Sequence, residues 1–192
     1  GRIGLVAGAT GAYIVFATNG YGTANERMRI TAAGDVGIGN TAPAQKLDVT
    51  GYINWSGQKR NTARFDKTSS TALAAVTGLS VTVNAGKTYY FEASLYTTSA
   101  LNGGVSVDIS GTTTASAIVY ETIITNGGVI TQQRATALGT ACSNKDVTAA
   151  FVSIKGTITT ATDGTLLVRF AQQISNATRS SVEINSTFIV NN

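Results

Sequence analysis

The side chains that could carry chemistry are few, because this 192-residue sequence contains no histidine. Histidine is the commonest general base and metal ligand, so its absence removes Ser-His and Cys-His nucleophile pairs. Glycoside hydrolysis remains chemically open, since it requires only two suitably spaced carboxylates. The candidates are Glu92, Asp108, Glu121 and Glu183. All of them fall in alternating segments at positions expected on the solvent face, which favours solvated carboxylates and a protein that is not an enzyme.

Other kinds of reactive site have little support in the sequence. Asp35, Asp48 and Asp163 are dispersed and form no calcium-loop pattern, although a trimer axis could gather one ligand from each chain. The glycine-rich segment 4–11 lacks a Gly-Lys-Ser/Thr ending, so it does not indicate a phosphate-binding loop. Cys142 is the single cysteine and is expected as an unpaired thiol in a loop or strand edge. We therefore expect no cofactor, no metal site and no catalytic residue.

Charge and hydropathy bear on the partners of the chain. Charged residues make up 12% of the sequence, are scattered singly and give a net charge of +4. A nucleic-acid-binding protein usually gathers its cations into a patch with interleaved aromatic residues. The sequence contains no such cluster, and no apolar run approaches the roughly 20 residues that span a bilayer. We expect neither nucleic-acid binding nor membrane insertion.

Two regions of different character must position any functional residue, and they meet near Gly57–Arg60. Upstream, glycine recurs every few residues and separates very short β-prone segments. These segments are Ile3–Ala7, Ala12–Ala17, Arg27–Thr31, Val36–Ile38 and Lys46–Thr50. Strands of this length bury little by themselves, so they need neighbours from other chains. Residues 1–58 are therefore predicted to form a short, intertwined, Gly-rich β-stem.

Downstream, the alternation of apolar and polar residues becomes longer. Tyr89 and Phe91 share one face of a predicted strand and Tyr90 and Tyr96 the other, and the pattern leaves open which pair is buried. Regular turn signals separate about eight to ten predicted strands, which is typical of a sandwich or jelly roll. Residues 59–192 are therefore predicted to form an antiparallel, jelly-roll-like β-sandwich head, with one brief helical turn within Thr68–Ala75.

A specific motif lies in the upstream region: Glu26-Arg-Met-Arg-Ile30, then Ala33-Gly-Asp-Val-Gly-Ile-Gly39, Pro43 and Lys46-Leu-Asp-Val-Thr-Gly51. This pattern resembles a recurring element of bacteriophage tail-fibre and tail-spike proteins, from which it departs in having Asp35 at a usual asparagine position. The resemblance implies an all-β, homotrimeric stem. Candidate residues of the trimer interface are Val36, Ile38, Leu47, Val49 and Trp55.

The downstream region is similar to a β-domain of phage structural proteins, on the segment Val76-Thr-Gly-Leu-Ser-Val-Thr-Val-Asn-Ala-Gly-Lys-Thr-Tyr89. Receptor sites on rigid β-scaffolds usually lie in loops, so the polar tips of this domain are the natural candidates. The candidate receptor-binding residues are Asn102, Asn126, Asn144, Lys145 and Tyr96. Trp55, Tyr96 and Tyr120 are the aromatic residues that could stack on a sugar, and Trp55 could instead anchor the stem to the head.

The sequence supports three hypotheses about function. The first is an extracellular, homotrimeric fibre protein of the virion whose head binds a bacterial surface glycan or protein. The second is a capsid-attached head fibre or decoration protein without receptor specificity. The third is a spike that cleaves polysaccharide, against which the lack of a long repetitive β-helix argues. The first residue is glycine, so we expect a fragment joined upstream of Gly1 to other virion proteins.

Overall fold

The computed structural model describes residues 2–6, 12–20, 23–51, 57–99 and 102–192, with only the backbone described for 2–6 and 23. The chain divides into two compact units, Gly1–Asn54 and Trp55–Asn192. As predicted, the chain is all-β: the described residues contain no α-helix, and a single 3-10 turn, η1, covers Thr23–Asn25. The helical turn expected within Thr68–Ala75 is wrong, because this segment has no helical residue, bends at Ser69 and joins a long strand at Ala74.

The first unit is a five-stranded sheet in which the strands follow their order in the chain, β1 to β5. The strands are β1 (Arg2–Val6), β2 (Tyr13–Ala17), β3 (Glu26–Ile30), β4 (Val36–Ile38) and β5 (Leu47–Val49). They lie close to the five predicted segments. Neighbouring strands are antiparallel except β4 and β5, which are parallel.

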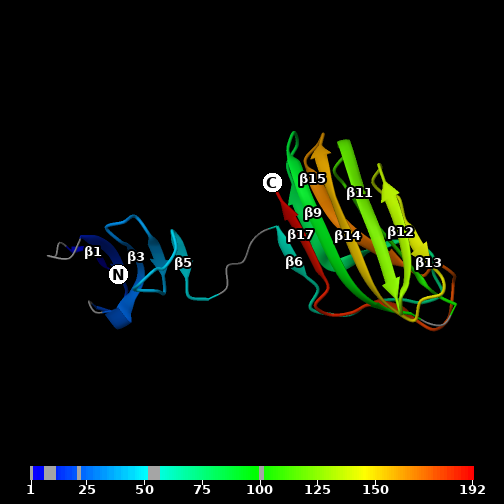
Figure 1. Cartoon of the computed structure of the whole chain (residues 1–192), viewed down its shortest axis with the longest axis horizontal. Coiled ribbons are helices and arrows are strands. Elements are labelled where there is room, and N and C mark those ends of the chain that lie inside the picture. Colours follow the sequence, from blue (N-terminus) through cyan, green and yellow to red (C-terminus); the bar gives the residue numbers. More distant parts are fainter. Residues whose placement is uncertain (1, 7–11, 21–22, 52–56, 100–101) are drawn as a thin grey trace. The chain divides into compact units, whose positions relative to one another are not determined.

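The second unit, here called the head, is an antiparallel β-sandwich (Figure 1). The smaller sheet has the order β13-β10-β15-β8, and the larger sheet has the order β12-β11-β14-β9, continued by β16-β7 and by β17-β6. The strands are β6 (Gln58–Arg60), β7 (Phe65–Lys67), β8 (Ala74–Val83), β9 (Thr88–Thr98), β10 (Val105–Gly111), β11 (Ala115–Asn126), β12 (Val129–Ala135), β13 (Cys142–Asn144), β14 (Ala149–Thr160), β15 (Gly164–Ala171), β16 (Ser180–Val182) and β17 (Thr187–Asn191).

The core of the head lies between the two sheets, and strand alternation decides which side chains enter it. In β9, Tyr89, Phe91, Ala93 and Leu95 are buried. The alternate residues face outward. Of the two tyrosine-bearing faces that the sequence could not tell apart, the face with Tyr89 is therefore the buried one. The inward residues of β8, β10, β14 and β15 meet this row, and the ring of Phe91 lies 6.5 Å from that of Phe188. Burial of this continuous apolar layer stabilises the head.

Two expectations about single residues are wrong. Asp108 was expected on the solvent face, but its side chain is fully buried because Arg169 covers it on the neighbouring strand β15. Tyr120 was a candidate for stacking on a sugar, but only 2% of it is exposed. Its ring packs 5.9 Å from that of Phe91 inside the sandwich. The candidate interface residue Trp55 lies outside the described residues.

Candidate binding surfaces

Four of the candidate receptor-binding residues lie at one end of the head, which we call the hairpin end. The pairing of Val105 with Asn144 brings the β9–β10 connection beside the end of β13. The two backbones are so close that a Cβ on Gly104 would lie 2.3 Å from the carbonyl oxygen of Asn144. The side chain of Asn126 reaches the same region, donating a hydrogen bond of 3.1 Å to the carbonyl of Asp146. The fold thus gathers Asn102, Asn126, Asn144 and Lys145 from three connections.

Most of these side chains already have partners within the chain. Asn144 donates to Thr131 at 2.7 Å and accepts from the backbone N–H of Asp146 at 2.9 Å. Lys145 pairs with Asp146 at 2.7 Å. The β11–β12 hairpin turns through Gly127 and Gly128 with φ of 54° and 93°, as a type I′ turn requires. The polar residues here therefore hold the loops in shape as well as facing solvent.

Tyr96, the fifth candidate, lies on the outer face of the larger sheet next to the hairpin end. It is 54% exposed, and its ring lies 5.5 Å from that of Phe151, which is 40% exposed. The register places Phe151 between Tyr96 on β9 and Thr125 on β11. The aromatic pair thus forms an exposed apolar patch on this face.

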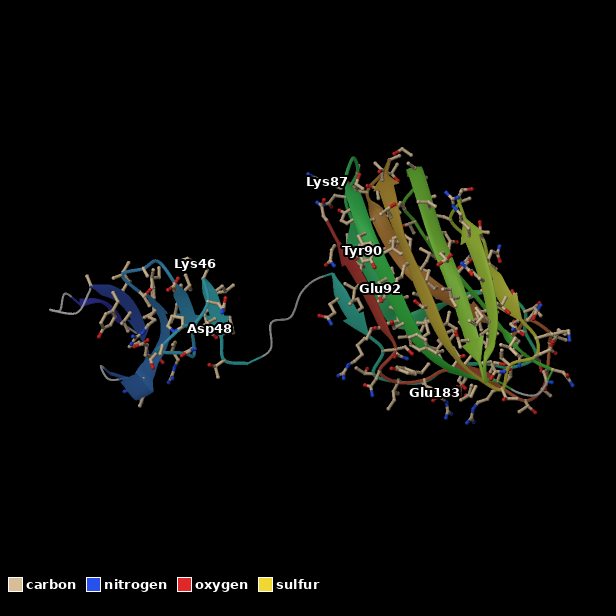
Figure 2. All side chains as sticks on the ribbon, in the orientation of Figure 1. Lys46, Asp48, Lys87, Tyr90, Glu92 and Glu183 are labelled. Atoms are coloured by element: carbon tan, nitrogen blue, oxygen red, sulfur yellow. The ribbon has the colours of Figure 1, made fainter. Side chains whose placement is uncertain are left out.

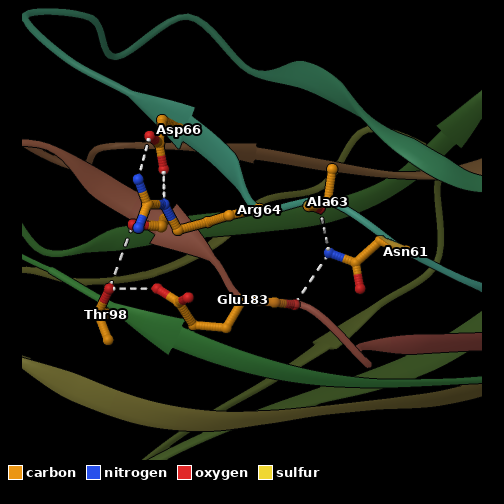
Figure 3. A network of polar contacts seen from close by, with 7 residues as sticks. Asn61, Ala63, Arg64, Asp66, Thr98 and Glu183 are labelled. Carbon is orange, nitrogen blue, oxygen red and sulfur yellow. Dashed lines mark hydrogen bonds and ion pairs between the residues drawn. The ribbon is translucent and has the colours of Figure 1, made fainter.

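A polar network holds the end of β9 that carries Tyr96 (Figure 3). The backbone N–H of Glu183 donates to the carbonyl of Tyr96 at 2.8 Å, and the hydroxyl of Thr98 donates to the Glu183 carboxylate at 2.7 Å. Beside them, Arg64 binds Asp66 through two hydrogen bonds of 2.7 and 3.1 Å, which lowers the pKa of Asp66. These contacts fix the exposed tyrosine on a rigid support.

A shallow hollow lies further along the outer face of the larger sheet, and we call it the Tyr90 hollow. Its walls come from four strands and comprise Tyr90, Val119, Glu121, Arg134, Lys155 and Thr157. Its floor is the backbone of Tyr120 and Gly156, whose side-chain positions face the core. Figure 2 labels Tyr90 and, on the same strand, Glu92.

Side chains in and beside the Tyr90 hollow are joined by hydrogen bonds and an ion pair. The Tyr90 hydroxyl donates to Glu92 at 3.2 Å, and Lys155 pairs with Glu92 at 3.1 Å. Partial burial, followed by the hydrogen bond to Glu92, raises the pKa of Tyr90. Glu121 accepts a hydrogen bond from Gln132, while Arg134, opposite Glu121 in the register, has no ion pair among the described residues. The hollow combines an aromatic wall with a row of hydrogen-bonding groups.

The residue pattern alone does not predict this hollow, although it contains one signal for part of it. The Asn126-Gly-Gly-Val129 turn pairs residue 126 with 129, and counting back along the hairpin places Glu121 opposite Arg134. No local signal places Lys155 beside Glu121, because β14 follows β11 only after β12 and β13.

The carboxylates considered for glycoside hydrolysis lie in different surroundings. Asp108 accepts two hydrogen bonds from Arg169, of 2.9 and 2.5 Å, and this pairing raises the pKa of the guanidinium. Glu183 is bound by Thr98, while Glu92 and Glu121 flank Lys155 on neighbouring strands. Among the residues that the structure describes, no cluster of three acidic or thiol side chains could hold a metal ion. No described helix is long and apolar enough to cross a membrane.

The sequence motif of the first unit forms a set of internal contacts. Glu26 pairs with Arg29 at 2.5 Å, and Lys46 pairs with Asp35 at 2.6 Å. Asp48 accepts hydrogen bonds from the side chain of Asn40 at 2.9 Å and from the backbone N–H of Ala44 at 3.0 Å. Lys46 and Asp48 are labelled in Figure 2. The charged residues of the motif thus hold together the connections of β3, β4 and β5.

The apolar residues of the motif share one face of this sheet. The register pairs Phe16 with Met28 and Met28 with Ile38, and then Ile38 with Val49. A parallel row runs through Ile14, Ile30, Val36 and Leu47. None of these eight side chains is buried, and Ile38 and Leu47 are 41% and 52% exposed. The structure therefore brings the candidates Val36, Ile38, Leu47 and Val49 together on an uncovered apolar face, which we call the apolar stem face.

Comparisons with known proteins give no relative on which a function can rest. No protein family matches the chain, and no curated protein matches it. Among solved structures, the chain has a likeness to the structure of infectious bursal disease virus Gx strain, with a TM-score of 0.18 and 11% sequence identity. The match covers 94% of this chain and 51% of the other, so this chain spans about half the length of that protein.

Proposed function

We propose that this chain is part of a homotrimeric virion fibre, in which the first unit joins three chains and the head binds a bacterial surface receptor, either a glycan or a protein. The observation that carries the proposal is the apolar stem face. Eight apolar side chains from four described strands lie on it and none is buried within the single chain. Contiguous exposed apolar surface of this kind marks an interaction site.

The covering partner in this proposal is the same face of two further copies. The opposite face of the sheet carries the buried Val15 and Ala17 and the ion pair of Glu26 with Arg29, whose side chains are only 5% and 14% exposed, so little of it remains to be covered. Burying apolar surface stabilises an assembly by roughly 25 cal/mol per Å². The number of chains follows from the resemblance of the motif to trimeric fibre elements. Three such faces around one axis would supply the core that the described strands of one unit lack.

The architecture of the head supports the second half of the proposal. The orders β8-β15-β10-β13 and β9-β14-β11-β12 are those of a double-sheet jelly roll, an architecture used in viral capsid and lectin domains. Its rigid sheets present loops at the hairpin end and aromatic side chains on an outer face, as receptor-binding scaffolds do. A trimer of heads would also multiply weak contacts through effective concentration.

The proposal is tested by the molar mass of the purified chain in light scattering, followed by binding of the same sample to a panel of bacterial cells. A trimer that binds cells is the expected result. A trimer that binds no cells would favour the capsid-attached or decoration role instead. A stable monomer would overturn the proposed assembly.

Variants at the hairpin end test where the receptor contact lies. Asn102 has a φ of 66°, so Asn102→Gly removes the side chain while keeping the backbone conformation. Lys145→Ala and Tyr96→Ala remove the other exposed groups without disturbing the bonds of Asn144. Loss of cell binding with an unchanged melting temperature would assign the contact to this end.

A further inference from the structure

We propose that the Tyr90 hollow is a sugar-binding site that takes a neutral pyranose unit of a surface glycan. This inference rests on the proposed function and deepens it, because it names the class of ligand and a site outside the loop tips. A site with few hydrogen-bonding groups beside an aromatic surface matches a pyranose, which has an apolar C–H face and a polar edge of hydroxyls.

The aromatic wall of the hollow is exposed and held in place. Tyr90 is 43% exposed, and the hydrogen bond from its hydroxyl to Glu92 limits movement of the ring. The register places Thr157 between Tyr90 and Val119, which is 37% exposed. These side chains form a small apolar surface that also carries the hydroxyls of Tyr90 and Thr157, and the C–H face of a sugar would pack against it.

The opposite wall, continued by Glu92 beside the hollow, alternates hydrogen-bond donors and acceptors. The register sets Arg134, Glu121, Lys155 and Glu92 side by side across β12, β11, β14 and β9. Vicinal hydroxyls of a sugar both donate and accept, so they suit such an alternating row. The charges of the row sum to zero, which favours a neutral sugar over an acidic one. The floor between the two walls is backbone, because the side chain of Tyr120 and the side-chain position of Gly156 both face the core.

The hollow also has side-chain groups available to a ligand, whereas much of the hairpin end is already bonded within the chain. Both polar ends of the Asn144 side chain and the amide nitrogen of Asn126 are bonded within the chain. In the hollow, Arg134 has no ion pair among the described residues and Tyr90 keeps an open ring face. A ligand can therefore bind there without breaking the bonds that shape a loop.

The test is an NMR titration of the isotope-labelled full chain with methyl glycosides of glucose, galactose, mannose and rhamnose. Glucuronic acid and N-acetylneuraminic acid serve as acidic comparators. We expect a neutral sugar to shift the amide signals of Gly156 and Thr157. Tyr90→Ala should weaken that binding roughly tenfold or more, because it removes the stacking ring. Phe151→Ala, which removes a similarly exposed aromatic ring from the same sheet face, is the matched control and should leave binding unchanged.

Each outcome separates the inference from the function on which it rests. Absence of shifts with every neutral sugar, stronger binding of the acidic sugars, or equal binding by Tyr90→Ala would overturn the sugar site. If the wild-type trimer binds cells and Tyr90→Ala binds them equally well, the receptor role stands and this site does not. If neutral sugars bind through Tyr90 but no cells are bound, the sugar site stands and the receptor role does not.

Discussion

At the scale of single residues, burial gives ordinary side chains unusual properties. Tyr120 lies between the sheets, and its hydroxyl donates to the carbonyl of Thr140 at 2.9 Å. Burial, followed by the nearby charge of Asp108, raises the pKa of Tyr120 to about 12. The thiol of Cys142 is likewise buried, and desolvation raises its pKa. A phenol and a thiol in such surroundings stay neutral and act as packing groups.

The raised pKa of Tyr120 predicts alkaline destabilisation of the head. Because the folded state keeps the phenol protonated, this contribution is complete below the unfolded pKa near 10 and is lost as pH rises through about 12. A difference of this size corresponds to about 2 to 3 kcal/mol. Chemical unfolding at pH 8, 10 and 12 measures the loss. Tyr120→Phe should lose less stability than the wild type over this range, and equal losses would contradict the assignment.

At the scale of elements, turn and connection residues decide how the short strands meet. The β4–β5 connection depends on Asp48, which binds Asn40 and Ala44, whereas the Lys46–Asp35 pair is largely exposed on the lysine side. A Cβ on Gly37 would lie 2.2 Å from the carbonyl oxygen of Asn40, so only glycine fits where the connection crosses β4. The charged residues and glycines of the motif therefore shape the sheet, while its apolar residues form the apolar stem face.

This difference predicts unequal effects of two substitutions in the same connection. Asp48→Ala should destabilise the first unit by about 1 to 2 kcal/mol, because it leaves the side chain of Asn40 and the N–H of Ala44 without their acceptor. Lys46→Ala should cost less than about 1 kcal/mol, as expected for an exposed ion pair. Amide hydrogen exchange of Ala44 measures the local effect. Equal protection of Ala44 in both variants would refute the role given to Asp48.

At the scale of the whole molecule, the two units differ in how complete they are as single chains. Every residue of the hydrophobic core cluster lies in the head, between Val76 and Val190. In the first unit, the buried apolar residues among those described are Val15 and Ala17, on the face opposite the apolar stem face. The head buries its own apolar layer, whereas the described part of the first unit leaves its apolar stem face uncovered.

A paired substitution tests this division of roles. Ile38→Asp with Leu47→Asp places charges on the apolar stem face, where an assembled trimer would bury them unpaired. We expect the molar mass in light scattering to fall from three chains to one while the head keeps its thermal transition. Val129→Asp with Ile130→Asp changes two even more exposed apolar residues of the head and should leave the mass at three chains. An unchanged mass in the stem variant would place the interface elsewhere.

Much of the local structure could be predicted from the sequence. The five short segments of the first unit, the alternating strands of the head and its tight turns follow from residue patterns of a few positions. The resemblance of the motif to a phage fibre element stays a prediction. Strand periodicity also predicted that Tyr89 and Tyr90 lie on opposite faces of the sheet, because neighbouring residues of a strand point to opposite sides. Periodicity alone could not say which of those faces would be buried.

The contacts that join distant parts of the chain could not be predicted from the sequence and follow from the three-dimensional pairing of the strands. Asp108 is buried because Arg169, which follows it by 61 residues in the chain, lies beside it on a neighbouring strand. Tyr120 enters the core and the Tyr90 hollow forms because β9, β11, β12 and β14 lie side by side in one register. The alternation of apolar and polar residues specifies the two faces of a strand. It does not specify which strands lie next to it or which of its faces is buried. Those follow from the pairing of strands across the whole head.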